Sequence, residues 1–84
     1  MKKNVIVTGA TGGIGKAICR TFSKDFNIFV IGRDLSRLKV LSQENKAIKG
    51  FFSCDLKDHN GIGKVIQKIL NEFSSIDILV NNAG

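Results

Sequence analysis

The stretch TGATGGIG at residues 8–15 decides how this chain folds. An apolar segment at residues 5–7 comes directly before it, and a helix is expected to begin near Gly13. Glycine suits such a junction because a residue without a side chain tolerates a sharp bend and a close backbone approach. A glycine-rich turn between a strand and a helix is typical of loops that bind the phosphates of a dinucleotide.

Each glycine of this stretch has a physical task in such a loop. Gly9 allows the tight turn out of the strand, and Gly13 lets the backbone approach a pyrophosphate. Gly15 lets the helix pack close to the sheet. The free N–H groups at the helix start, together with the positive end of its dipole, then face the phosphates. The alternative is an ordinary glycine-rich turn, and the strand–turn–helix context favours the cofactor loop.

Apolar segments alternate with amphipathic segments along the rest of the chain. The expected strands are residues 4–8, 27–31, 47–54 and 76–80, and the expected helices are residues 13–24, 35–45 and 60–73. Apolar residues at helical spacing predict which side of each helix faces inward. These residues are Ile14, Ala17, Ile18 and Phe22 in the first helix, Leu38 and Leu41 in the second, and Ile62, Val65, Ile66, Ile69, Leu70 and Phe73 in the third.

This alternation predicts an α/β fold with a parallel sheet covered on both faces. Right-handed crossovers give the strand order 3-2-1-4, which is the N-terminal half of a doubly wound, Rossmann-type sheet. A ligand is expected at the carboxyl ends of the first and fourth strands, where the winding direction switches. The length of 84 residues allows one domain, residues 1–84.

Composition and charge favour a cytoplasmic protein that binds neither nucleic acid nor membrane. The net charge is +6, but the basic residues are scattered and form no dense block. No apolar run approaches the roughly 18 residues that span a bilayer. Cys19 and Cys54 lie far apart and are expected as free thiols. His59, the only histidine, is expected in a loop before a helix and gives a metal site little support.

With these segments placed, the chain resembles the N-terminal half of the short-chain dehydrogenase/reductase family over all 84 residues. The resemblance rests on the glycine run at 8–15, on Gly-Arg-Asp at 32–34, on Cys-Asp-Leu at 54–56 and on Asn-Asn-Ala-Gly at 81–84. The glycine run alone also fits the extended, sugar-nucleotide branch of the family. The last motif is characteristic of the short, single-domain branch. Within it, the chain looks most like bacterial 3-oxoacyl-[acyl-carrier-protein] reductases.

The resemblance implies a set of cofactor-binding residues. Thr8 would anchor the loop with its hydroxyl, although a buried strand-end threonine is the simpler interpretation. Asn82 and its neighbour Asn81 would tie the central strands to the cofactor-side backbone. Lys16 either adds positive potential beside the phosphates or is a solvated helix lysine, and the second is favoured. The full set is Thr8, Gly9, Thr11, Gly12, Gly13, Ile14, Gly15, Arg33, Asp55, Leu56, Asn82, Ala83 and Gly84.

Arg33 indicates which dinucleotide is preferred. Relatives that prefer NAD carry an acidic group at the end of the second strand, which accepts from the ribose 2′-OH. Here Gly32 holds that position and Arg33 follows it. An arginine can pair with a 2′-phosphate through two parallel hydrogen bonds. The sequence therefore predicts NADP(H) over NAD(H). A shift of one residue would bring Asp34 into the acidic role, and a solvated Arg33 is the other alternative.

Asp55 resembles the aspartate of the family that contacts adenine. Its carboxylate would accept from the ring amino group while Leu56 backs the ring. A turn or capping aspartate is the alternative.

The catalytic half of the family's machinery is missing from these residues. The family uses a Tyr-x-x-x-Lys pair with an upstream serine and an asparagine, and this chain contains no tyrosine. We expect the cofactor half of an NAD(P)(H)-dependent oxidoreductase, inactive alone, that would reduce a carbonyl such as a 3-oxoacyl thioester or oxidise an alcohol. A stand-alone nucleotide-binding module, one chain of a split enzyme and a gene remnant are the alternatives. The edge of strand 76–80 is expected to promote self-association.

Overall fold

Four parallel strands form one sheet in the order β3-β2-β1-β4 within residues 2–82, the part of the chain that the computed structural model describes. The strands are β1 (Lys3–Thr8), β2 (Phe26–Gly32), β3 (Ile48–Ser53) and β4 (Ile78–Asn81). This order confirms the expected N-terminal half of a doubly wound sheet.

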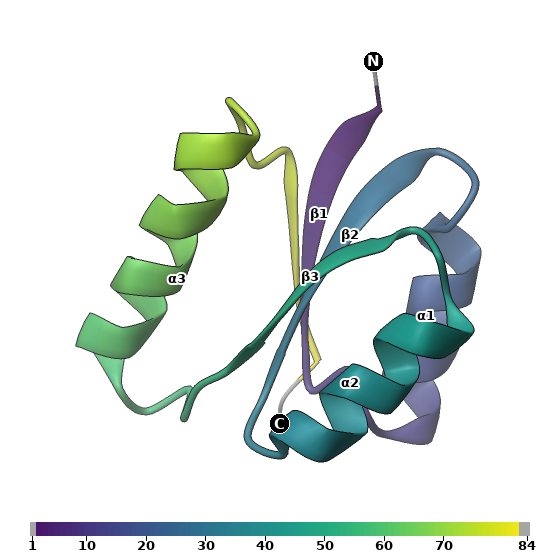
Figure 1. The fold of residues 1–84 in the computed structure, drawn as a ribbon, viewed down its shortest axis with the longest axis horizontal. Coiled ribbons are helices and arrows are strands. Elements are labelled where there is room, and N and C mark those ends of the chain that lie inside the picture. Colours follow the sequence, from purple (N-terminus) through teal and green to yellow (C-terminus); the bar gives the residue numbers. More distant parts are fainter. Residues whose placement is uncertain (1, 83–84) are drawn as a thin grey trace.

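Three helices connect the strands and cover both faces of the sheet. They are α1 (Gly13–Phe22), α2 (Leu35–Glu44) and α3 (His59–Glu72). Figure 1 shows α1 and α2 together on one face and α3 alone on the other. This distribution follows because all crossovers are right-handed. The chain passes from β3 to β4, on the other side of β1, and its connecting helix α3 therefore covers the opposite face of the sheet.

The core has two layers because successive strand residues point to opposite faces of the sheet. Val5, Val7 and Ile28 belong to the layer under α1 and α2, with Cys19 and Leu38 from those helices. The layer under α3 contains four buried residues, Ile6, Phe29, Ile31 and Ile69. Both faces of β1 and β2 are therefore buried, which explains their near-continuous apolar sequences.

The pairing register brings three chain segments to one end of the sheet. Thr8 is the Cα partner of Ile31 in β2 and of Asn81 in β4. The glycine loop after β1, the Gly32-Arg33 turn after β2 and the end of β4 consequently lie together. This is the end at which the sequence places the ligand.

The first helix is shorter than expected, and a different side of it faces the sheet. It ends at Phe22 rather than at residue 24, and Ile14 is 72% exposed. Ala17 is exposed as well, so the prediction that these two residues face inward was wrong. The buried residues of α1 are Gly15 and Cys19. The close contact of Gly15 with the preceding loop fixes the rotation of the helix and turns Ile14 outward.

The fourth strand begins two residues later than expected. The Asn4 N–H donates to the Asp77 carboxylate at 2.8 Å, and the Asp77 N–H donates to the Asn4 carbonyl at 2.9 Å. A side chain thus takes the place of a backbone acceptor beside Asn4, and the regular ladder starts only at Ile78.

The third helix begins one residue earlier than expected. Asp58 is its N-cap, which decides between the two capping candidates, Asp58 and Asn60, and His59 is its first residue rather than part of a loop. The predicted inward face of α3 is confirmed except at Leu70, which is 37% exposed.

Both cysteines are free thiols. None of the helices within residues 2–82 combines the length and apolar character needed for a membrane crossing.

Candidate cofactor site

The turn after β1 uses a backbone conformation that favours glycine. Gly9 has a φ of 62°, in the left-handed region that L side chains rarely adopt. Its N–H donates to the Ile31 carbonyl at 3.1 Å, so the turn is fixed to the neighbouring strand β2. The sequence-based role of Gly9 as the residue of the tight turn is confirmed.

Gly15 has no room for a side chain. A Cβ atom placed there would lie 2.6 Å from Cα of Ala10 and would also overlap the Gly9 carbonyl oxygen. The crowding atoms belong to the backbone of the loop that leaves β1, so the close approach expected of Gly15 is made at this loop. The glycine lets α1 fold back against its own entry loop.

Gly13 differs from Gly15 because the space in front of it is open. Apart from its chain neighbours and the backbone of its own helical turn, no heavy atom lies within 4 Å of a Cβ placed on Gly13. Ile14, which follows it, is exposed, and Thr11 before it is half-buried. This side of the loop can therefore accept a group that approaches the backbone closely, as the fit of a diphosphate requires.

The start of α1 is open also in its hydrogen bonding. Gly12 is the N-cap and has no side chain with which to cap. The first N–H groups of an α-helix have no acceptor within the helix, and the helix dipole places partial positive charge there. The first turn contains no acidic residue. An anion can therefore take the place of a capping side chain at this helix start.

Thr8 and Asn82 fasten the loop and β4 to each other. The Thr8 hydroxyl lies 3.3 Å from the Val80 carbonyl oxygen and 3.2 Å from the Asn81 side-chain oxygen. It also accepts from the Asn82 N–H at 3.0 Å. The Asn82 side-chain amide donates to the Gly9 carbonyl at 3.1 Å. The tie between the central strands and the loop that the resemblance implies for Asn82 is therefore present, and Thr8 is buried at the strand end. The two other residues of this motif, Ala83 and Gly84, lie outside the described residues.

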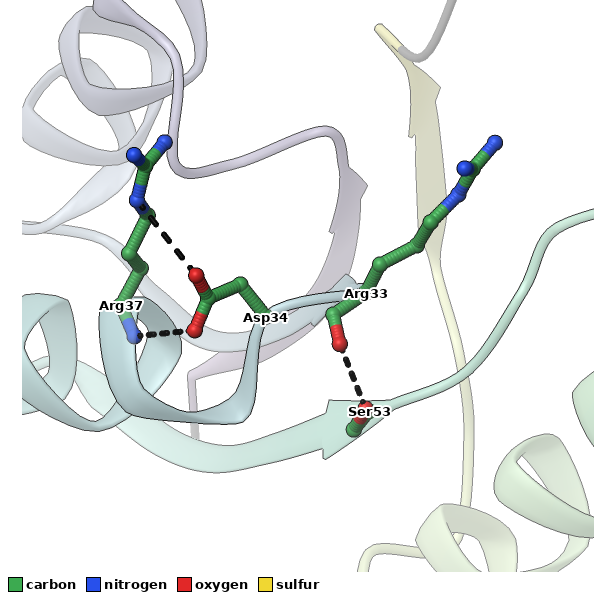
Figure 2. A network of polar contacts seen from close by, with 4 residues as sticks. All are labelled: Arg33, Asp34, Arg37 and Ser53. Carbon is green, nitrogen blue, oxygen red and sulfur yellow. Dashed lines mark hydrogen bonds and ion pairs between the residues drawn. The ribbon is translucent and has the colours of Figure 1, made fainter.

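Arg33 and Asp34 have separate surroundings after β2. The Asp34 carboxylate caps α2, accepting from the Arg37 N–H at 3.2 Å, and its other oxygen lies 3.5 Å from Arg37 Nε. The Arg33 carbonyl accepts from the Ser53 hydroxyl at 2.9 Å, while the Arg33 side chain points away from Asp34 (Figure 2). Among residues 2–82 the Arg33 guanidinium has no ion-pair partner. Asp34 is thus occupied in a helix cap, and Arg33 remains available.

Asp55 lies in the turn before α3. One carboxylate oxygen accepts from the Lys57 N–H at 3.0 Å, and the Asp55 carbonyl accepts from the Asp58 N–H at 2.8 Å. These contacts make Asp55 a turn residue, as the alternative interpretation holds. The second carboxylate oxygen remains for another donor. Leu56 is half-buried and packs into the layer under α3.

Neither thiol of the chain is activated. Burial raises the pKa of the Cys19 thiol, and the nearby Arg20 opposes this only in part. Partial desolvation raises the pKa of Cys54, and the carboxylates of Asp58 and Asp55 raise it further. Both cysteines are therefore protonated at neutral pH, and neither offers a thiolate nucleophile.

Two residues beside this site, Ser36 and Arg37, were not predicted from the sequence. Together with Thr11 and Lys16 they line a pocket of about 310 Å³ between the starts of α1 and α2. The available signal was the capping aspartate at position 34. A residue three positions after an N-cap donates to the capping side chain, and this draws Arg37 to the start of the helix.

The comparisons with known proteins agree with this geometry. The family model for short chain dehydrogenase matches residues 3–84. Serine 3-dehydrogenase of Agrobacterium fabrum is 37% identical over 86 residues, which cover 100% of this chain and 34% of that protein.

Two similar solved structures contain a dinucleotide. A variant of actinorhodin polyketide ketoreductase with NADPH has a TM-score of 0.88 and 31% identity, covering 99% of this chain and 33% of that one. ElxO with NADP bound has a TM-score of 0.85 and 36% identity, covering 100% of this chain and 36% of that one. This chain spans between about a quarter and about a third of the length of the curated relatives that it matches. On the family model and on the fold, the chain belongs to the short-chain dehydrogenase family.

Proposed function

We propose that residues 1–84 form the part of a short-chain oxidoreductase that binds NADP(H). One observation carries the proposal: the uncapped start of α1, faced by Gly12 and Gly13, is held at the carboxyl ends of β1 and β4 by the Asn82–Gly9 hydrogen bond. A backbone that leaves N–H groups unsatisfied at this end of a parallel sheet suits a dinucleotide diphosphate.

The diphosphate would be held by backbone rather than by side chains. The N–H groups of residues 12–15 supply donors, and the open face of Gly13 allows the close approach. Thr11 borders the same space and adds a hydroxyl. Gly9 and Gly15 contribute indirectly, because they allow the loop to adopt this shape.

The preference for NADP(H) over NAD(H) rests on Arg33. Its guanidinium is free to form two parallel hydrogen bonds with a 2′-phosphate. Asp34 is engaged with Arg37, which weakens the alternative in which Asp34 accepts from a ribose 2′-OH. The similar structures with NADP and NADPH support this choice.

The remaining cofactor contacts are assigned by the family resemblance. The free oxygen of the Asp55 carboxylate would accept from the adenine amino group, with Leu56 beside the ring. The resemblance implies that Ala83 and Gly84 allow the close approach of the riboses, while Asn82 ties the strands to the cofactor-side backbone. When bound, the nicotinamide supplies or accepts a hydride. The residues of this chain hold and orient the cofactor for that step.

The substrate would be a small carbonyl compound or the corresponding alcohol. A 3-oxoacyl thioester is the substrate class that the subfamily resemblance favours, and the similarity to serine 3-dehydrogenase favours a hydroxy amino acid instead. Two assays on the gene product that contains residues 1–84 distinguish these substrate classes. One measures reduction of an acetoacetyl thioester with NADPH, and the other measures serine oxidation with NADP⁺.

The isolated polypeptide of 84 residues is also proposed to self-associate. Within residues 2–82, β4 pairs only with β1, and Leu79 on it is 62% exposed. An open strand edge with apolar side chains favours pairing with another chain. Analytical ultracentrifugation should show dimers or larger species, and a monodisperse monomer would contradict this.

Calorimetric titration with NADPH and NADH tests the cofactor proposal. NADPH should bind at least tenfold more tightly than NADH, and it should raise the thermal midpoint, because a ligand specific for the native state stabilises that state. Arg33→Ala should remove most of the difference, whereas Arg20→Ala, at the far end of α1, should not. Equal or tighter binding of NADH would overturn the NADP(H) preference, and binding of neither would overturn the proposed function.

A further inference from the structure

The turn after β2 is held from the side by the end of β3. The Ser53 hydroxyl donates to the Arg33 carbonyl at 2.9 Å, and the Cys54 N–H donates to the Gly32 carbonyl at 2.8 Å. Two consecutive carbonyls of the turn thus accept from two consecutive residues of the neighbouring segment. Any residue with a backbone N–H can make the contact at position 54. The contact with the Arg33 carbonyl, in contrast, requires a side-chain donor at position 53.

The guanidinium of Arg33 has no such support. Figure 2 shows the Arg33 side chain pointing away from Asp34, whose carboxylate is engaged with Arg37. Within residues 2–82 neither a hydrogen bond nor an ion pair fixes the Arg33 guanidinium. Arginine is among the side chains that lose the most rotamer freedom when they are ordered. The direction in which this side chain leaves the turn is therefore set by the backbone of Arg33 and by the contacts that hold that backbone.

A hydrogen bond to the Arg33 carbonyl restrains the backbone at the arginine itself. The carbonyl carbon is bonded to the Arg33 Cα and belongs to the planar peptide group that joins Arg33 to Asp34. A donor fixed to its oxygen therefore limits both rotation about ψ of Arg33 and tilting of that peptide group. The donor, Ser53, lies 20 residues further along the chain. The end of β3 thus helps to orient the turn after β2.

We propose that Ser53 is a positioning residue for the NADP(H) preference: its hydroxyl holds the Arg33 backbone in the orientation from which the guanidinium reaches the 2′-phosphate. Ser53 acts through Arg33 and not through a contact of its own with the cofactor. This inference rests on the proposed function, in which Arg33 pairs with that phosphate. It goes further by making the selectivity of a side chain after β2 depend on a hydroxyl at the end of β3.

The simpler interpretation is that the Ser53 hydroxyl only stabilises the end of the sheet. Its removal would then lower the free energy of unfolding and change the affinities of NADPH and NADH by the same factor, because the two dinucleotides differ only in the 2′-phosphate. Positioning of Arg33 instead predicts an effect confined to NADPH. It also predicts that this effect disappears when the arginine side chain is absent.

The experiment measures dissociation constants for NADPH and NADH with Ser53→Ala, Arg33→Ala and the double variant. Ser53→Ala should weaken NADPH about threefold, which corresponds to the loss of one exposed hydrogen bond. NADH binding by Ser53→Ala, and NADPH binding on adding Ser53→Ala to Arg33→Ala, should change less than about 1.5-fold, since the effect requires both the phosphate and the arginine. Ser53→Thr keeps a hydroxyl and should restore the affinity for NADPH.

Ser42→Ala is the matched control, because the Ser42 hydroxyl also donates to a backbone carbonyl, that of Lys39, at 2.7 Å within α2. A second measurement needs no cofactor. The Asp34 amide belongs to the same peptide group as the Arg33 carbonyl, so its NMR order parameter in the ligand-free chain should fall with Ser53→Ala. It should stay unchanged with Ser53→Thr and with Ser42→Ala.

The possible failures are distinct. If Arg33→Ala removes the preference for NADPH but Ser53→Ala keeps it, the positioning role is overturned and the proposed function stands. If Ser53→Ala weakens NADPH and NADH alike, or weakens NADPH equally without Arg33, the hydroxyl does not act through the arginine, which also overturns the role. If the unmodified chain binds no dinucleotide, the proposed function fails and this inference fails with it.

Discussion

The starts of α1 and α3 both follow a parallel strand and both have glycine within their first turns, yet their first N–H groups are capped differently. At α3 the Asp58 carboxylate accepts from the Gly61 N–H at 3.1 Å. It sits so close that a Cβ on Gly61 would lie 2.7 Å from its oxygen. At α1 the N-cap is Gly12, which has no side chain, and the space at Gly13 is open.

The difference supports the proposed position of the dinucleotide at α1. A helix start needs acceptors for its first N–H groups. The sequence supplies a carboxylate at α3 and another, Asp34, at α2. At α1 it supplies only glycine, while Asn82 fixes the loop in position. Within residues 2–82 no side chain caps α1, so its first N–H groups are open to water or to an anion such as the proposed diphosphate.

The largest expected effect comes from filling the closed side of the α1 loop. Gly15→Ala places a methyl group against Ala10 and the Gly9 carbonyl, both backbone positions that cannot move cheaply. We expect a loss of about 3 kcal/mol in the free energy of unfolding, at the upper end for overpacking. Urea denaturation measures it.

Gly13→Ala is the matched control for Gly15→Ala, because nothing lies within 4 Å of its Cβ position. Its unfolding free energy should change by less than about 1 kcal/mol, since alanine is the better helix former. Equal destabilisation by the two substitutions would show that the loop does not pack against α1 as described.

Converting the start of α1 into the form found at α3 should have the next largest effect. Gly12→Asp introduces a carboxylate at a residue whose φ of −76° suits any side chain. The carboxylate should cap the helix, stabilising the unliganded chain by about 0.5–1 kcal/mol. It should also repel and displace the diphosphate, weakening NADPH about a hundredfold, or about 2.7 kcal/mol.

Thermal unfolding with and without NADPH measures both effects of Gly12→Asp. Gly12→Ser is the control, because it caps without adding charge. Normal NADPH binding by the Gly12→Asp variant would place the diphosphate elsewhere.

Removing the tie between β4 and the loop should have an intermediate effect. Asn82→Ala deletes the donor to the Gly9 carbonyl, and we expect a loss of about 1.5 kcal/mol in unfolding free energy. Denaturation of Asn71→Ala serves as the comparison, since Asn71 is exposed and only accepts from Gln67. A loss no greater than that of Asn71→Ala would contradict the anchoring role.

The smallest expected effect is the loss of the cap at α3. Asp58→Ala should cost about 1 kcal/mol, typical of an N-cap. NADPH affinity should fall far less than for Gly12→Asp, because Asp58 meets the proposed site only through the turn at Asp55. Asp25→Ala, at an exposed turn between α1 and β2, controls for the loss of one negative charge. A large fall in NADPH affinity for Asp58→Ala alone would remove the distinction between the two helix starts.

The sequence predicted the sheet order and the tight turn at Gly9, because both follow from local patterns. Alternation of apolar strands and amphipathic helices determines the topology, and few residues other than glycine suit a positive φ. The positions of Ile14 and Asp77 could not be predicted in this way. Ile14 is exposed because Gly15 contacts a loop, and Asp77 displaces the start of β4 by binding Asn4, which lies 73 residues earlier.

The candidate site was also predictable only where it depends on local patterns. The glycines were identified from their spacing, and the functions of Arg33, Asp55 and Leu56 remain predictions. Arg37 was missed because its place in the α1–α2 pocket depends on how two helices approach each other. The distance between two packed helices is set by tertiary structure, and hydrophobic periodicity carries no information about it.

Titration of the isotope-labelled chain with NADPH, followed residue by residue through its amide NMR signals, tests the central claim most directly. Binding of the diphosphate at the start of α1 predicts the largest shifts at the amides of Gly12, Gly13, Ile14 and Gly15, with little change at Gly61 and Gly63 in α3. Shifts centred on α3, or saturation with the signals of residues 12–15 unmoved, would contradict the account.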